Sequence, residues 1–214
     1  MPDLGTTLVL GKIWNCLRKE IKKVWTKNET SVWTLAIMQG LDNCREFLGE
    51  GNSSTIFRKG INGEYILDFT LTTWPNKIGK LSDLPAEGIP HYSIVLAAES
   101  EMGKYGSTKE NFERVMEDFC KLIDIKAKYK VMLYGLHQSL NDTAEYNLEA
   151  AFGRILNHHE WIDLSKESWL FVGLPWKYGK YDDSLNLSIK HGHTKVLYAS
   201  IQAGTIFLQD LPSS

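Results

Sequence analysis

The sequence predicts an α/β protein with a central mixed β-sheet flanked by helices. Short apolar runs at residues 92–99, 129–134 and 168–174 have the length and composition of strands that are covered on both faces. Between them, at residues 107–124 and 143–157, apolar side chains recur every three or four residues, which is the spacing of a helix packed on one side. Alternation of strands with such helices is typical of a sheet that carries helices on its faces.

Two helices are predicted ahead of the first strand. The first covers residues 8–26, where the apolar side chains form one stripe and the lysines fall on the other side. The second covers residues 31–48 and ends at the glycines of residues 49–52, which favour the end of a helix. Basic residues gather near the start of the chain, and we interpret them as a solvated helix face rather than a phosphate-binding stripe. They are Lys12, Arg18, Lys19, Lys22, Lys23 and Lys27.

The other strands are predicted from their turns and breaks. Residues 54–59 and 63–71 are expected to form a β-hairpin, because a glycine-containing turn separates two runs of strand length. Residues 74–90 contain three prolines and are predicted to be a loop. The end of the chain is predicted to form two further strands, at residues 184–190 and 195–208.

Length and composition are those of one globular domain. The chain has 214 residues, of which 43% are hydrophobic and 23% are charged. We expect a single domain over residues 1–214, with a core at residues 31–135, the helix at residues 8–26 before it and an α/β elaboration at residues 136–214. The net charge of −2 excludes a globally basic nucleic-acid binder, so contact with a nucleic acid would need a local patch.

Cysteine usage and hydropathy predict a soluble, cytoplasmic protein. The three cysteines each fall in a predicted helix, lack the spacing of a metal site and are predicted to be reduced thiols. No apolar run approaches the roughly 20 residues that cross a bilayer, so no membrane contact is expected. Residues 8–10 are too short for the apolar part of a signal peptide. The cysteines are Cys16, Cys44 and Cys120.

Carboxylates occupy two of the apolar runs, where buried strands rarely carry them. Asp68 lies in the run at residues 63–71, and Glu99 and Glu101 lie in the run at residues 92–101. Burial of an ionised carboxylate is costly unless a cation or a hydrogen-bond donor compensates it. Alternate residues of a strand share a face, so Glu99 and Glu101 are expected to project together, and pairing of the two runs would bring Asp68 beside them. Such oxygen ligands favour Mg²⁺ or Mn²⁺ over zinc, and the alternative is a solvated strand end.

The order of a helix, a hairpin with an aspartate, a strand with Glu-x-Glu, a helix and a strand resembles the PD-(D/E)xK nuclease superfamily. This superfamily has the restriction-endonuclease-like fold, and the resemblance covers about residues 31–135. The segments that carry it are Leu67-Asp68-Phe69, Ala98-Glu99-Ser100-Glu101 and Lys130-Val131-Met132-Leu133-Tyr134. The resemblance implies that Asp68 and Glu99 bind Mg²⁺ or Mn²⁺, that the backbone carbonyl of Ser100 joins them, and that the chain is a DNA endonuclease.

The sequence departs from the family pattern at one position of this site. Glu101 stands where a lysine is usual, and the resemblance implies that such a glutamate is a general base or a ligand of a second metal ion. Two nearby lysines are left out of the predicted site, because Lys104 is expected at the surface and Lys121 lies opposite the apolar stripe of its helix. Family members often add an acidic residue from the preceding helix, where Glu46 and Glu50 are interpreted here as solvated.

Two other functions stay open beside a DNA endonuclease. A nuclease fold without activity would be a nucleic-acid or protein-binding module. The aromatic C-terminal third could instead belong to a host-defence or mobile-element interaction protein. The choices between DNA and RNA and between a monomer and a homodimer also stay open. Weaker candidates for metal binding or base stacking are interpreted as helix-end, turn and packing residues. They are His158, His159, Glu160, His191, His193, Trp169, Trp176, Tyr178 and Tyr181.

Overall fold

The computed structural model describes residues 4–25, 27, 29–48, 53–57, 67–73, 93–102, 107–136, 144–159, 162–175 and 194–212. The helices of this part are α1 (Leu4–Val24), α2 (Thr30–Asn43), α3 (Arg45–Leu48), α4 (Thr108–Asp124) and α5 (Leu148–His158), with a short 3-10 helix at Ala144–Tyr146. The strands are β1 (Ser53–Phe57), β2 (Phe69–Thr73), β3 (Ser93–Glu101), β4 (Ala127–Leu136), β5 (Ser168–Pro175), β6 (Lys195–Gln202) and β7 (Thr205–Asp210).

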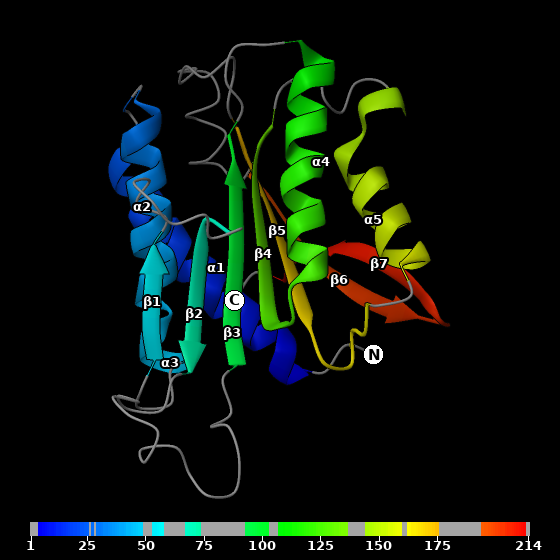
Figure 1. The fold of residues 1–214 in the computed structure, drawn as a ribbon, viewed down its shortest axis with the longest axis horizontal. Coiled ribbons are helices and arrows are strands. Elements are labelled where there is room, and N and C mark those ends of the chain that lie inside the picture. Colours follow the sequence, from blue (N-terminus) through cyan, green and yellow to red (C-terminus); the bar gives the residue numbers. More distant parts are fainter. Residues whose placement is uncertain are drawn as a thin grey trace, which may run out of the picture.

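These strands form one mixed sheet in the order β1-β2-β3-β4-β5-β6-β7 (Figure 1). β1, β2 and β3 pair antiparallel, β3, β4 and β5 pair parallel, and β6 and β7 continue antiparallel. Helices α4 and α5 make the crossover connections that parallel neighbours require. The predicted α/β class, with a central mixed sheet and flanking helices, is confirmed.

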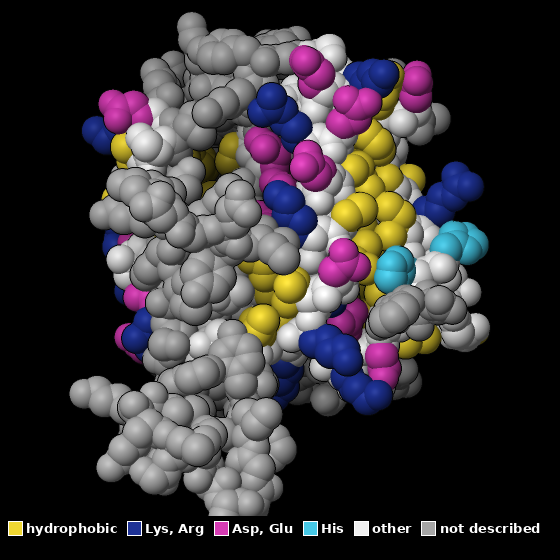
Figure 2. All heavy atoms as spheres, viewed as in Figure 1, with side chains coloured by type: hydrophobic (Ala, Val, Ile, Leu, Met, Phe, Trp, Pro, Cys, Tyr) yellow, Lys and Arg dark blue, Asp and Glu magenta, His cyan; other side chains and the backbone are white. Residues whose placement is uncertain are grey.

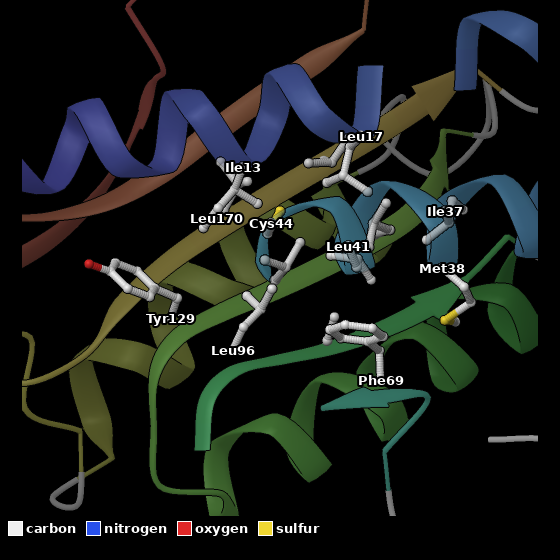
Figure 3. Close-up of a cluster of buried hydrophobic side chains, with 14 of the residues drawn as sticks. Ile13, Leu17, Ile37, Met38, Leu41, Cys44, Phe69, Leu96, Tyr129 and Leu170 are labelled. Carbon is white, nitrogen blue, oxygen red and sulfur yellow. The ribbon is translucent and has the colours of Figure 1, made fainter. Parts of the chain in front are cut away.

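One face of the sheet is covered by α1 and α2, which lie behind it in Figure 1. In Figure 3, Ile13 and Leu17 of α1 and Leu41 of α2 lie over Leu96 of β3 and Leu170 of β5. None of these five side chains retains any exposed surface. Full burial of one such side chain contributes about 1.5–3 kcal/mol, so this layer is a main source of stability.

Close contact between α1 and α2 depends on a glycine. A Cβ atom added to Gly40 would lie 2.8 Å from Cα of Leu17 and 3.2 Å from the carbonyl oxygen of Cys16. Both are backbone atoms, so the two helices would have to move apart. We therefore expect Gly40→Ala to lower the free energy of unfolding by about 1–2 kcal/mol, even though alanine has the higher helix propensity.

A matched control for this prediction lies in α1. A Cβ atom added to Gly11 meets nothing within 4 Å, so Gly11→Ala is expected to raise the free energy of unfolding by up to about 1 kcal/mol. Denaturant unfolding of both variants measures the contrast. Equal stabilisation by the two substitutions would contradict the close helix contact at Gly40.

The other face of the sheet is covered by α4 and α5 through an aromatic cluster. Phe119 of α4 lies 4.6 Å from Phe152 of α5 and 5.5 Å from Trp169 of β5, measured between ring centroids. Trp169 in turn stacks on Phe171 at 5.9 Å. Trp169 is fully buried, so this tryptophan packs in the core and does not offer a stacking surface.

The start of α4 was predicted within one residue. The side chain of Ser107 accepts a hydrogen bond from the backbone N–H of Glu110, and the Glu110 carboxylate accepts one from the backbone N–H of Ser107. This reciprocal capping box satisfies two donors that a helix start would otherwise leave unpaired.

The predicted helix at residues 31–48 is wrong in its continuity. The structure divides it into α2 and α3 at Cys44, whose backbone N–H bonds to the carbonyl of Leu41 at 3.1 Å. This three-residue step tightens the last turn of α2 and ends it. All three cysteines are free thiols. No helix in the described ranges is both long and apolar enough to span a membrane.

The predicted strand at residues 195–208 is also wrong in its continuity, because it folds into the β6–β7 hairpin. The turn residues Ala203 and Gly204 have φ angles of 49° and 81°. Two left-handed residues are characteristic of the tight turn that suits a twisted hairpin. Alanine seldom adopts this conformation, so the pair carries a weak turn signal. The predicted strand at residues 184–190 lies outside the described residues.

The outer edge of β7 contacts the side chain of Asn157 on α5. Its Nδ2 donates to the carbonyl oxygen of Ile206 at 2.7 Å, and its Oδ1 accepts from the backbone N–H of Ile206 at 2.7 Å. Ile206 pairs with Ile201 across the hairpin. The Asn157 amide therefore bonds to one residue of β7 as a neighbouring strand would.

Candidate functional site

The two acid-bearing segments of the predicted site lie side by side. β2 pairs with β3 through Phe69 and Ala98, so continuing this register places Asp68 opposite Glu99. The backbone N–H of Ser100 donates a hydrogen bond to Oδ2 of Asp68 at 3.1 Å. This bond fixes the Asp68 carboxylate against the end of β3.

Asp68 itself precedes the strand rather than lying within it. The prediction placed a strand at residues 63–71, but β2 begins at Phe69 and Asp68 lies in a bend. Leu67 and Phe69 pack in hydrophobic clusters on opposite faces of the sheet, so the regular alternation of a strand breaks at Asp68. Asp68 lies on the face that α4 covers, where it lines a cavity together with side chains of α4.

Glu99 is the most unusual ionisable group of the site. Its side chain is 1% exposed, and its Oε1 is buried without a hydrogen-bond partner in the described part of the molecule. Burial, and then the charge of Asp68, raise the pKa of Glu99 to about 9, and a hydrogen bond with Asp68 adds to the rise. At neutral pH this carboxyl group is therefore protonated.

A polar cavity of about 410 Å³ opens beside these two acids, between the end of β3 and the outer side of α4. Glu101 reaches the cavity because Glu101 and Glu99 are two residues apart on β3 and therefore share the side of the strand that faces α4. The side chains and backbone that line the cavity come from the two strand ends and from α4. They are Asp68, Ser100, Glu101, Arg114, Glu117, Asp118 and Lys121.

Lys121, which was left out of the predicted site, lies beside the predicted acids. Lys121 lines the cavity, its side chain is only 29% exposed, and its Nζ lies 2.5 Å from Oδ1 of Asp118. The apolar stripe of α4 packs on the sheet, and Lys121 flanks this stripe on the side of β3 instead of pointing away from it. The Lys121 charge opposes the rise in the pKa of Glu99, whereas the Asp118 charge adds to it.

Arg114, Glu117 and Asp118 were missed as well. With Lys121 they recur at three- and four-residue steps, so they form one charged flank of α4. Figure 2 shows basic and acidic side chains intermingled along this helix. The sequence signal for these residues was their three- and four-residue spacing beside the apolar stripe of the helix. This spacing shows that they share one side of the helix, but not which strand that side lies against.

The three predicted carboxylates are not placed as a complete set of metal ligands. Asp68 and Glu99 are in contact, and Glu101 lines the same cavity as Asp68. Across the described ranges, no group of three or more His, Cys, Asp or Glu side chains is placed to hold a metal ion. Asp68 and Glu99 are the two carboxyl groups that this geometry places in contact.

The other candidates from the sequence do not join the site. Lys130 is fully buried, with Nζ 2.8 Å from Oε2 of Glu167 and 4.6 Å from the ring centroid of Trp169. Burial lowers the pKa of Lys130, which the Glu167 carboxylate opposes. Glu46 is exposed on α3, and His158 and His159 end α5. Several candidates lie outside the described residues, namely Glu50, Lys104, Glu160, Trp176, Tyr178, Tyr181, His191 and His193.

No protein-family model, curated protein or solved structure matches the chain. The features of the chain that bear on its function are therefore the geometry of Asp68 and Glu99 and the cavity beside them.

Proposed function

We propose that this protein is a metal-dependent phosphodiesterase that cleaves DNA, with a core of the PD-(D/E)xK nuclease type built from α2, β1, β2, β3, α4 and β4. The observation that carries the proposal is the contact between a fully buried Glu99 and Asp68, which lines an open polar cavity. Burial and the neighbouring Asp68 disfavour the ionised state of Glu99, and this weakens the fold. Strongly shifted acids beside a cavity are typical of functional sites.

The residues present fit a hard divalent cation. Asp68, Glu99 and the backbone carbonyl of Ser100 would hold Mg²⁺ or Mn²⁺, and the unpartnered Oε1 of Glu99 is free to become a ligand atom. Proteins commonly bind Mg²⁺ through one or two carboxylates and leave several water ligands, so a third carboxylate is not required. When bound, such an ion lowers the pKa of a coordinated water and stabilises negative charge on a phosphate.

The protein's own groups then have separate tasks. The Ser100 N–H holds Asp68 in position. Glu101, which lines the cavity, is the group placed to accept a proton from an attacking water, as a general base. Asp118 holds Lys121 beside Glu99, where a positive charge favours the ionised carboxylate that a cation needs.

Cation titration by calorimetry tests this function. Because the folded protein holds Glu99 protonated below about pH 9, a cation that binds Glu99 must displace its proton. We expect the affinity for Mn²⁺ to rise between pH 6 and pH 9 and then to level. At pH 7.5 binding should release about one proton, measured from the heats in buffers of different ionisation enthalpy.

Plasmid nicking in Mg²⁺ accompanies the titration and separates the alternatives. Cation binding with nicking supports the nuclease. A protein that binds neither Mg²⁺ nor Mn²⁺ and leaves DNA intact would be a binding module, and the proposed function would be wrong. An affinity for Mn²⁺ that does not change between pH 6 and pH 9 would remove Glu99 from the ligands.

A further inference from the structure

We propose that Arg114 binds a phosphate group of the substrate, and that it does so only after the cation is in place. This inference rests on the proposed function and assigns the site a substrate class, a phosphate ester held by its anionic oxygens. The observations that carry it are the position of Arg114 on the cavity wall, its lack of an ion pair with any described residue, and the charge of the remaining lining.

Arg114 forms no ion pair within the described ranges, although carboxylates lie near it on α4. It lies one helical turn before Asp118, at the four-residue spacing that favours an ion pair. Asp118 is bonded to Lys121 instead, at 2.5 Å. Elsewhere on the same helix, Lys109 approaches Glu113 at 3.7 Å. The guanidinium of Arg114 therefore lines the cavity with its donors available to a ligand.

The chemistry of this side chain suits a phosphate. A guanidinium stays protonated at all relevant pH values and presents parallel N–H donors that match two phosphate oxygens. The cavity, at about 410 Å³, is within the range of sites that bind small ligands. Asp68 and Ser100 line the same cavity, so a phosphate bonded to Arg114 would lie next to the proposed cation ligands.

The charge of the cavity sets the order of binding. Four carboxylates line it, against the two cations Arg114 and Lys121, which gives the lining a formal charge of −2. A phosphate ester would meet net repulsion there. A divalent cation offsets this negative charge and adds a positive centre next to the phosphate. Phosphate binding should therefore require the cation.

Calorimetry with thymidine 5′-monophosphate tests the inference, because this ester has no internal diester bond to be cleaved. The wild-type protein should bind it in the presence of Mn²⁺ and show no measurable binding without Mn²⁺. Arg114→Gln should weaken the binding at least about tenfold, and Arg114→Lys should restore part of it. Mn²⁺ affinity should not fall in either variant. Arg154→Gln, on the exposed side of α5, is the matched control and should bind the nucleotide as the wild type does.

The outcomes separate this inference from the function that it depends on. Equal nucleotide binding by wild type and Arg114→Gln, with Mn²⁺ binding intact, overturns the role of Arg114 and leaves the proposed function standing. Equal binding with and without Mn²⁺ overturns the order of binding. Failure of the wild-type protein to bind Mn²⁺ overturns the proposed function and this inference together. Because Arg114 is exposed, Arg114→Gln is expected to fold, and thermal unfolding checks this.

Discussion

Glu99→Gln is expected to abolish Mg²⁺-dependent DNA cleavage and, at the same time, to stabilise the fold. Cleavage should fall by about a thousandfold or more, because the amide cannot supply the negatively charged ligand that the cation requires. The fold gains because the folded protein must keep Glu99 protonated, with a pKa of about 9 against a reference value of 4.5. At pH 7 that proton uptake lowers the free energy of unfolding by about 3 kcal/mol, which the variant would recover.

The direction of the pH dependence follows from the same shift. Between pH 4.5 and pH 9 the folded wild-type protein binds one more proton at Glu99 than the unfolded chain does. This contribution to its free energy of unfolding therefore falls as the pH rises through that range, and Glu99→Gln lacks it. Thermal unfolding without added cations should show equal stability of the two proteins near pH 4.5 and a growing advantage of the variant toward pH 9. A variant that cleaves DNA normally, or that is less stable than the wild type at pH 8, would contradict the assignment of Glu99.

Asp68→Ala is the second substitution with a large expected effect on DNA cleavage. Its expected effect on the free energy of unfolding is small. Mg²⁺-dependent nicking should disappear, because one of the two carboxylate ligands is lost. The Ser100 N–H loses its acceptor at a cost of about 1 kcal/mol. Removal of the charge beside Glu99 offsets part of this cost and lowers the pKa of Glu99. The free energy of unfolding should therefore stay within about 1 kcal/mol of the wild-type value.

A plasmid nicking assay and denaturant unfolding measure the two effects of Asp68→Ala. Asp163→Ala is the control, because Asp163 is a partly exposed acid that bonds to Ser165 and Lys166 and does not line the cavity of the candidate site. The control variant should nick DNA as the wild type does. Undiminished cleavage by a folded Asp68→Ala protein would end the case for nuclease chemistry at this position.

Local patterns predicted much of the fold around the site. The helix at residues 107–124 has a capping serine and a regular apolar stripe, and the structure places α4 at Thr108–Asp124. The apolar run at residues 92–99 is β3, and it pairs with β2, in the antiparallel direction. Strand alternation placed Glu99 and Glu101 on one face, and the assumed pairing of the two acid-bearing runs, which the structure shows as β2 with β3, brought Asp68 beside Glu99.

The rest of the site depends on how α4 packs against the sheet. The spacing of apolar residues along the sequence does not determine that packing. The stripe of α4 shows which side faces the sheet, but not that its flank overhangs the end of β3. For that reason Arg114 and Lys121 could not be assigned to the cavity. Lys130 illustrates the same limit in reverse. Lys130 lies in a strand of the segment that resembles the nuclease family, but this position does not identify its partner. The partner is Glu167, which lies 37 positions later and is brought to Lys130 by the parallel pairing of β4 and β5.

The Asn157 amide has a consequence for how copies of this protein can associate. The last strand of an open sheet exposes a row of unpaired N–H and C=O groups, which other chains can extend into a larger sheet or an aggregate. On β7 the outward groups of Ile206 are already bonded to Asn157. An incoming peptide would have to displace the Asn157 side chain before it could pair with β7 at this point. The amide therefore protects this edge of the sheet against strand addition by another chain.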